Sequence, residues 1–367
     1  MPTPSARLLT SQLVATAMIL ASAVTARAQE SPARAVRAFP APSNTSRSPV
    51  QGDSTEGRRT WFLNDRGYYE PLIAEPHAAR LFLLFPGWSS EFPHSVNTGN
   101  RFAWQVSTGR EIPIAGWQSA SGTERLEKGQ IGFGVWIPIA FHMIEDFKDT
   151  SNPIVDTDYR FGFMGKLQYG LGSAWWLGVR FVPWAHESTH LGDEYTLLAQ
   201  RDPAFERVNV SYEYYEYGFS LEHSFGTNGR LFVRHGGLTP WGDDGYYSDH
   251  LLGETDGTIT PSRKNYEPSF GAEIRLPSAI NTNGTTRRQW FASLDARHKL
   301  AYAYHQRSAA DERRHLSWSF AVGQTDTETG TRVLQAYFVY AYHGVNPYGQ
   351  LRTQPDHTAV GLGWIFR

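Results

Sequence analysis

A histidine, a serine and a second histidine stand at alternate positions in one segment of this 367-residue chain. The segment reads WAHESTHLGDE, so His186, Ser188 and His190 share one face if the segment is a strand. An imidazole beside a hydroxyl is the minimal activated nucleophile, because the imidazole takes the proton as the oxygen attacks. The pattern predicts Ser188 as a nucleophile with His186 or His190 as its general base.

Such a pair also needs a group that orients the imidazole and a group that holds the oxyanion. Our first candidate for the orienting group is Glu216, on the next predicted strand, and the alternatives are Asp158, Asp193 and Glu194. Arg180 and Arg160 are the candidates for binding the negative charge of a lipid or an oxyanion. The acids Asp193 and Glu194 are also candidate ligands of a divalent cation, for which calcium is the expected ion.

The same segment contains HESTH, an H-E-x-x-H sequence, which binds zinc when it lies on a helix. In a strand, two residues four positions apart are separated by ~13 Å, which is too far for His186 and His190 to share one ion. Glu187 would then point to the opposite face. We therefore reject the zinc site and keep two alternatives to catalysis, a structural hydrogen-bond network and metal binding by the loop acids.

The residues before and after this segment alternate in polarity, which indicates strands. Between Ile131 and Met143 every second side chain is large and apolar, while the other face carries glycine, proline and histidine. Continued through Trp175–His190, the alternation places Arg180, His186, Ser188 and His190 together on the polar face. Near the C-terminus, Phe338, Tyr340 and Tyr342 fall on the apolar face.

Many of these segments reach the ~9–11 residues that a tilted membrane-spanning strand needs. Aromatic residues make up 14% of the chain and charged residues 19%, which is typical of a transmembrane barrel. The sequence predicts an all-β fold, an antiparallel outer-membrane β-barrel of about 12 strands (between about 10 and 14). Its expected strands are residues 80–85, 99–107, 130–142, 156–169, 174–190, 208–223, 229–235, 267–276, 289–302, 315–324, 332–343 and 357–366.

The polar face of these strands would line the lumen. Its charges are mixed in sign, which predicts a filled, salt-bridged interior rather than a selective pore. They are Asp158, Arg160, Lys166, Arg180, Glu216, Glu273, Arg275, Asp295, Arg297 and Lys299.

Residues 1–28 have the features of a secretory signal peptide, with an apolar stretch at Leu13–Val24 and an A-x-A cleavage site ending at Ala28. Residues 29–60 are rich in proline, serine and arginine and predict a disordered linker. Residues 61–79 predict an irregular segment or plug, and residues 80–367 the barrel. The chain ends in AVGLGWIFR, which resembles the amphipathic C-terminal strand with a terminal aromatic that the barrel assembly machinery recognises, although Arg367 follows Phe366 here.

The formal net charge of −2 argues against a nucleic-acid partner held by bulk positive charge. The absence of cysteine excludes disulfides, thiolate metal sites and cysteine nucleophiles. No nucleotide-binding fingerprint is present. The partners expected are therefore the lipids of a Gram-negative outer membrane, and the serine chemistry requires no cofactor.

On a barrel strand, His186-Glu187-Ser188 resembles the His-x-Ser of the outer membrane phospholipase A family. That resemblance implies a lipid-facing dyad, an asparagine from the neighbouring strand, a homodimer and calcium at its interface. Here the nearest asparagine is Asn209, and the alternation places the dyad on the lumen side instead. The longer string His186-x-Ser188-x-His190-x-Gly192-Asp193-Glu194, with Pro71–His77, is similar to a family of bacterial envelope proteins of unknown function.

Three functions remain open from the sequence. The most concrete is a lipid-acting serine hydrolase, a phospholipase or lipopolysaccharide deacylase. The alternatives are a small-solute channel with a polar lumen and a non-enzymatic envelope barrel.

Overall fold

The computed structural model describes most of the chain after its first 58 residues, with gaps in the connections between strands. The described residues are 59–62, 68–76, 78–89, 101–119, 126–147, 153–172, 174–192, 210–226, 229–240, 246–247, 266–277, 281–282, 286–301, 313–328, 334–348 and 356–366. The predicted signal peptide and nearly all of the predicted linker lie outside them and stay predictions.

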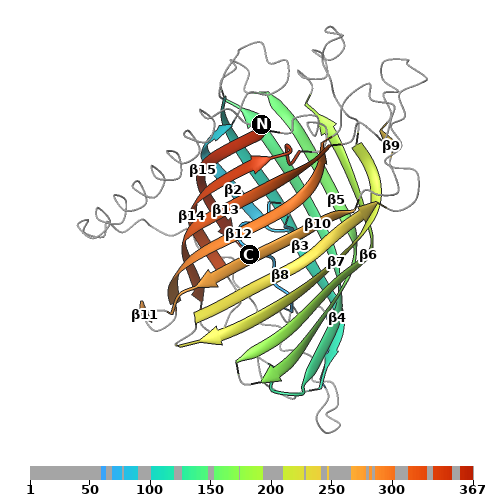
Figure 1. Ribbon diagram of the computed structural model, residues 1–367, viewed down its shortest axis with the longest axis vertical. Helices are drawn as coiled ribbons and strands as arrows, with labels where there is room; N and C mark the ends of the chain where they lie inside the picture. Colours follow the sequence, from blue (N-terminus) through green and yellow to red (C-terminus); the bar gives the residue numbers. More distant parts are fainter. Residues whose placement is uncertain are drawn as a thin grey trace. The chain divides into compact units, whose positions relative to one another are not determined.

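Twelve long strands form an antiparallel barrel in which neighbours along the chain are neighbours in the wall (Figure 1). They are β2 (Leu81–Ser89), β3 (Arg101–Gln118), β4 (Ile131–Asp146), β5 (Ile154–Gly172), β6 (Trp175–Leu191), β7 (Val210–Phe225), β8 (Gly229–Pro240), β10 (Glu267–Arg275), β12 (Thr286–Ala301), β13 (Arg313–Glu328), β14 (Leu334–Gly344) and β15 (His357–Phe366). Three short strands pair at the edges: β1 (Arg59–Phe62), β9 (Tyr246–Tyr247) and β11 (Asn281–Thr282).

The wall closes on itself because the last strand, β15, pairs with β2, and β2 and β4 both pair with β3. All the barrel pairings are antiparallel, so no sheet edge is left along the main wall. This confirms the predicted fold class and an even strand number, and the expected strand 80–85 is β2. Several strands are longer than expected, above all β3, which extends to Gln118.

The exterior of the barrel is apolar and its interior is polar over most of the wall. On β4, Phe133, Val135 and Ile139 are exposed to the outside, while Trp136 and His142, on the other face of the strand, are buried inside. Exposed aromatic and aliphatic side chains continue around the barrel on β5, β6, β7, β10 and β13. A band of this kind is what a lipid bilayer requires of a spanning barrel.

Among the described residues, no helix has both the length and the apolar character needed to cross a membrane.

Residues 68–76 and 78–80, which we call the interior segment, lie inside the barrel and stand between β1 and β2 in the sequence. Both β1 and β2 run antiparallel to β3, β1 beside Ala115–Gln118 and β2 beside Arg101–Ser107. β1 and β2 therefore occupy the same strand position in the wall, beside β3. The chain leaves this position after β1 and returns to it at β2. The interior segment is thus tethered at both ends. The element that precedes it, β1 (Arg59–Phe62), is a strand, whereas the sequence predicted a linker up to residue 60 and an irregular segment from residue 61.

Backbone groups of the interior segment bond to polar side chains of the opposite wall. Ile73 N–H donates to Glu273 Oε2 at 2.7 Å, and Ala74 N–H donates to Ser293 Oγ at 3.0 Å. Ser319 Oγ donates to the carbonyl of Ala74 at 2.6 Å. These three side chains supply the partners that a buried, non-sheet backbone needs.

Arg80 holds the turn of the interior segment from within. Its guanidinium donates to the carbonyl oxygens of Leu72, Ile73 and Glu75 at 2.7, 2.8 and 2.6 Å. One buried cation therefore donates hydrogen bonds to three carbonyl oxygens that have no strand partner. Arg80 is followed at once by β2, so this clamp fixes the point where the chain re-enters the wall.

Glu75 is the charged centre of the interior. Its Oε1 lies 3.2 Å from Arg297 Nη2 and 3.5 Å from Arg180 Nη2, which come from opposite parts of the wall. Burial alone would raise the pKa of the Glu75 carboxyl, but the guanidinium groups of Arg180 and Arg297 outweigh burial and hold that pKa below its usual range. Arg180 also pairs with Glu216. This mixed network confirms the prediction of a salt-bridged interior.

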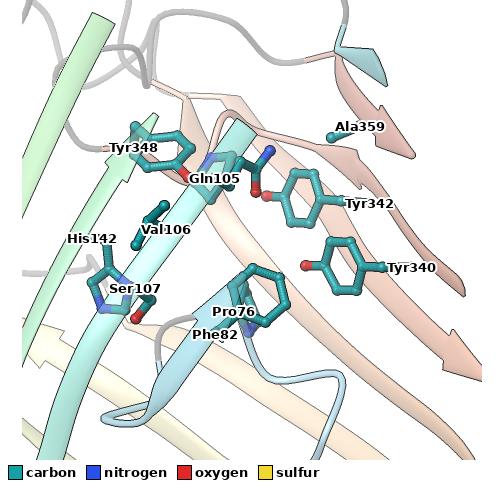
Figure 2. Close-up of a pocket in the computed structure, with 11 residues that line it drawn as sticks. Pro76, Phe82, Gln105, Val106, Ser107, His142, Tyr340, Tyr342, Tyr348 and Ala359 are labelled. Carbon is teal, nitrogen blue, oxygen red and sulfur yellow. The ribbon is translucent and has the colours of Figure 1, made fainter. Parts of the chain in front are cut away.

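A small cavity remains between the interior segment and the chain that follows β14 (Figure 2). It measures about 20 Å³ and is lined by polar tips of Gln105, Ser107, Tyr340 and Tyr348, among others. That volume is room for about one water molecule.

The predicted outward position of Phe338, Tyr340 and Tyr342 on β14 is wrong. These three side chains are buried inside, where they pack with Ile73 and Phe82 as one apolar cluster. The exposed residue of this strand is Tyr337. The reason is the interior segment, because its apolar residues need an apolar wall on one side of the lumen.

Tyr69 of the interior segment packs against the barrel wall at Gly218, which has no side chain. Its backbone is left-handed, with φ of 52°, and its ring lies between the guanidinium groups of Arg180 and Arg234, 5.1 and 4.6 Å from them. A Cβ added to Gly218 would stand 2.2 Å from the Tyr69 hydroxyl oxygen. The wall therefore needs a glycine at position 218.

Gly218→Ala is expected to destabilise the barrel by about 1–3 kcal/mol, because Tyr69 must leave its place between two arginines. The measurement is the midpoint of the heat-induced mobility shift on gels. Gly165→Ala on β5 is the matched control, since its added Cβ meets no atom nearer than 3.8 Å. Equal midpoints for the two variants would show that Tyr69 does not depend on this contact.

Candidate active site

The strand that carries the serine and histidines changes face partway along its length. On β6, Trp176, Arg180 and Val182 are buried inside, at even positions, but Ala185 and Glu187 are buried further on, at odd positions. The pairing of β6 with β7 shifts between Val182 and Ala185, which marks a β-bulge. One extra residue at a bulge moves every later side chain to the other face.

Because of this bulge, His186, Ser188 and His190 lie on the outer surface of the barrel, and we call them the His–Ser patch. His190 is exposed, and His186 and Ser188 are half-exposed. The prediction that the patch shares the lumen face with Arg180 is wrong, since the alternation breaks at the bulge. That the segment is a strand, with Glu187 on the face opposite the histidines, is confirmed.

Within the patch, Ser188 and His190 are in direct contact. Ser188 Oγ lies 3.2 Å from His190 Nε2, which is a hydrogen bond between a hydroxyl and an imidazole. The pair is open to the outside. This is the geometry that a general base needs in order to take the proton of a serine nucleophile.

Aromatic and polar side chains of the flanking strands surround the pair. Tyr159 of β5 is directly opposite Ser188, and its ring centroid lies 5.8 Å from that of His190. Thr157 Oγ1 donates to the backbone carbonyl of His190 at 3.2 Å. On the other side, exposed Glu213 of β7 is opposite His186. The backbone of β6 is therefore fixed on both sides at the patch.

The connections between strands assign this end of β6 to the outer surface. β5 and β6 are joined through residues 173–174 and β7 and β8 through residues 226–228, whereas the chain from β6 to β7 runs from residue 192 to residue 209. Outer-membrane barrels have short turns on the periplasmic side and long loops outside. Ser188 lies near the long-loop end.

The position of Ser188 along β6 corresponds to the edge of the hydrocarbon layer. From Trp175, at the short-turn end, to Ser188 the strand rises by ~43 Å, at ~3.3 Å per residue. A tilt of ~40° turns that distance into a height of ~33 Å, against a hydrocarbon core ~30 Å thick. With Trp175 taken as the inner edge of the hydrocarbon layer, these lengths would put the hydroxyl of Ser188 at the level of the ester groups of outer-leaflet lipids.

The acid predicted to orient the imidazole lies on the other side of the wall. Glu216 is buried in the lumen, where its carboxylate pairs with Arg160 at 2.7 Å and with Arg180. The prediction that it shares a face with Ser188 is wrong. Arg160 and Arg180 are consequently held inside as well and do not reach a charge bound at Ser188.

The other predicted groups either lie away from Ser188 and His190 or lie outside the described residues. Asp158 is buried in the lumen, opposite Thr189. Asp193, Glu194 and Asn209 lie outside the described residues. In the part of the chain that the structure describes, no group of three or more acidic or histidine side chains is arranged to hold a metal ion.

A closed antiparallel barrel with an apolar exterior and a polar interior is an integral protein of the outer membrane. The chain belongs to the DUF1207 family of proteins of unknown function, whose profile matches residues 11–244. The match includes the interior segment and the His–Ser patch. It begins before Trp61 and ends before the C-terminal strands, so its extent differs from the one expected from the sequence.

Three solved structures are similar to this chain over most of its length, at low sequence identity. Outer membrane phospholipase A from Escherichia coli is 12% identical, with 82% of this chain and 95% of that chain covered and a TM-score of 0.41. LpxR from Salmonella typhimurium is 9% identical, with 78% and 99% covered and a TM-score of 0.36. The transport unit of the autotransporter AIDA-I from Escherichia coli is 12% identical, with 80% and 92% covered and a TM-score of 0.34. Among curated proteins, none matches the chain.

Sequence reasoning missed the charged anchors of the interior segment. Glu75 and Arg80 stand in a stretch that reads as irregular, yet both are buried. The signal in the sequence was the presence of Glu75 and Arg80 in a stretch rich in apolar residues that shows neither strand nor helix periodicity. Such residues need internal partners, and the excess of predicted lumen arginines and lysines over lumen acids could have indicated that Glu75 would bind there.

Proposed function

We propose that this outer-membrane barrel hydrolyses an acyl ester of a membrane lipid, with Ser188 as nucleophile and His190 as general base. The observation that carries the proposal is the 3.2 Å contact between Ser188 Oγ and His190 Nε2 on the outer surface of β6. The height of Ser188, at the level of lipid esters, supports a lipid substrate. Substrates would reach the serine by lateral diffusion in the outer leaflet.

The bond-forming and bond-breaking steps use the two side chains and water, beside the orienting and oxyanion-binding groups that such chemistry needs. Ser188 Oγ attacks the ester carbonyl carbon while its proton passes to His190 Nε2. The tetrahedral intermediate collapses as His190 gives that proton to the leaving alkoxide, which departs as an alcohol or lysolipid. Water then attacks the acyl-serine with the same imidazole as base, releasing a fatty acid and restoring Ser188.

Calcium at the loop acids, a homodimer and recognition of β15 by the barrel assembly machinery remain proposals beside this one. The filled interior weighs against the alternative of a small-solute channel. Glu75, Arg80 and Arg297 occupy the space that an aqueous path would need.

The test is acyl release by the purified, refolded protein. Heat-shifted mobility first establishes that the barrel is folded, and fatty acid is then measured from phospholipid and from lipopolysaccharide, each with and without calcium. We expect fatty acid from at least one lipid. A folded barrel that releases none under any of these conditions would refute the proposal, and a requirement for calcium would support a cation role for Asp193 and Glu194.

A further inference from the structure

Three aromatic side chains form a continuous surface on the membrane side of the His–Ser patch. Trp184 lies between Phe161 and Phe163 of β5, with ring centroids 5.3 and 5.9 Å away. Phe161 and Phe163 are 47% and 52% exposed, so the surface faces lipid. We call Phe161, Phe163 and Trp184 the aromatic surface.

The aromatic surface owes its position to the same bulge that turns Ser188 outward. Before the bulge, even positions of β6 such as Arg180 face the lumen. Trp184 follows the bulge, faces outward and is paired in register with Phe163. The bulge therefore brings Trp184 and Ser188 onto one outer face together.

Contact between the aromatic surface and the His–Ser patch is direct. The ring of Phe161 lies 5.6 Å from that of His186, which is opposite it in register. His186 is the nearest residue of the patch on the same face of β6, two positions before Ser188. A line of rings thus leads from the lipid-facing wall to His186, two positions before the serine.

The depth of the aromatic surface matches the length of an acyl chain. Trp184 is four residues below Ser188, which corresponds to ~13 Å along the strand and ~10 Å in height. One leaflet contributes ~15 Å of hydrocarbon. With its ester at Ser188, a lipid chain that follows β6 toward the bilayer centre passes over Trp184.

We propose that the aromatic surface binds the acyl chain of the ester that Ser188 attacks, and that Trp184 makes the enzyme selective for long chains. The proposal rests on the proposed function. A long chain gains contact with all three rings, while an ester with a short chain reaches only the patch. The substrate class that follows is a long-chain ester lipid of the outer leaflet.

The competing role for Trp184 is that of an interfacial aromatic with no part in substrate binding, as aromatic girdles have in other barrels. Trp175 provides the comparison on the same strand. It is 40% exposed on the outer face, but at the short-turn end, where it stacks on His223 at 4.1 Å. It cannot contact a chain whose ester is at Ser188.

The experiment compares Trp184→Ala with Trp175→Ala on p-nitrophenyl butyrate and p-nitrophenyl palmitate in the same mixed micelles. The two esters share a leaving group and differ only in chain length. For Trp184→Ala we expect kcat/KM on palmitate to fall ~10-fold or more, with butyrate unchanged. Trp184→Phe should restore part of the palmitate activity, and Trp175→Ala should leave the ratio of the two activities at the wild-type value.

Two results would overturn the selectivity inference alone. One is a wild-type ratio in Trp184→Ala, and the other is an equal loss on both esters, which would mean a structural effect. Both presuppose that Ser188→Ala abolishes turnover of both esters. If instead Ser188→Ala remains active, or the folded wild-type protein hydrolyses neither ester, the proposed function fails and this inference fails with it.

Discussion

Ser188→Ala is expected to lower acyl release by about 10³-fold or more, because the proposed acyl intermediate forms on Ser188 Oγ. His190→Ala should cause a loss of similar size, since residues that act as a unit are each indispensable. The measurement is the initial rate of fatty acid release by refolded protein in lipid vesicles. His186→Ala should keep more activity than His190→Ala, because the contact with Ser188 Oγ comes from His190.

Matched controls separate loss of chemistry from loss of fold. Ser269→Ala removes a half-exposed hydroxyl from β10, and His235→Ala removes an exposed imidazole from β8. Both controls should keep wild-type rates and wild-type heat-shifted mobility. Full activity in folded Ser188→Ala would contradict the assignment of the nucleophile.

Glu75→Gln is expected to destabilise the folded barrel by about 3 kcal/mol, because it breaks buried ion pairs and leaves Arg180 and Arg297 with less compensation. The interior segment should then leave the lumen more often. Trypsin cleavage after Arg80, which is buried in the wild-type protein, is the direct readout. Glu70→Gln is the matched control, since Glu70 belongs to the same segment but is half-exposed and lies 3.7 Å from Arg275. Equal cleavage of the two variants would refute the central role of Glu75.

Acid should act on the same contact. In the folded protein, Arg180 and Arg297 overcome the effect of burial and hold the pKa of Glu75 below its ordinary value of 4.5. A depressed pKa contributes stability that is complete above the ordinary value and is lost as the pH falls toward the folded value. The midpoint temperature of the heat-induced mobility shift should therefore decrease when the pH is lowered below about 4. This decrease should be smaller in Glu75→Gln than in the wild-type protein. An identical acid dependence in both proteins would show that other carboxylates carry it.

The barrel could be predicted from the sequence because strand periodicity is a local property. Alternation over a segment such as Ile131–Met143 fixes which side chains face lipid, and closure then follows from the need to leave no edge. β4 and the lumen charges came out as expected for this reason. The orientation of β14 was predicted wrongly, because its aromatic side chains pack against the interior segment, which is distant in sequence.

The candidate site shows where local periodicity stops being sufficient. Ser188 and the histidines were recognised by type and spacing, but a single bulge between Val182 and Ala185 moved them to the opposite side of the wall. Pro183 stands at that point, and proline within strands is confined to edges and bulges, so the shift had a visible signal. Glu216 does face the lumen as predicted, and Ser188 was predicted beside it only because an unbroken alternation was assumed along β6.

The outward orientation of the His–Ser patch also changes how this chain compares with the outer membrane phospholipase A family. The outer membrane phospholipase A family was expected to differ because its dyad faces lipid. In this chain the His–Ser patch faces outward too. The partner of the serine is nevertheless His190, two positions after it, rather than His186, two positions before it.

The most direct test of the account is covalent labelling of Ser188 by a fluorophosphonate, a reagent that reacts with activated serines. Folded wild-type barrel would be labelled in detergent and the modified residue located by mass spectrometry, beside His190→Ala and His235→Ala. The account predicts an adduct on Ser188 that forms in His235→Ala and is lost in His190→Ala. An unlabelled Ser188 in folded wild-type protein, or equal labelling in His190→Ala, would contradict it.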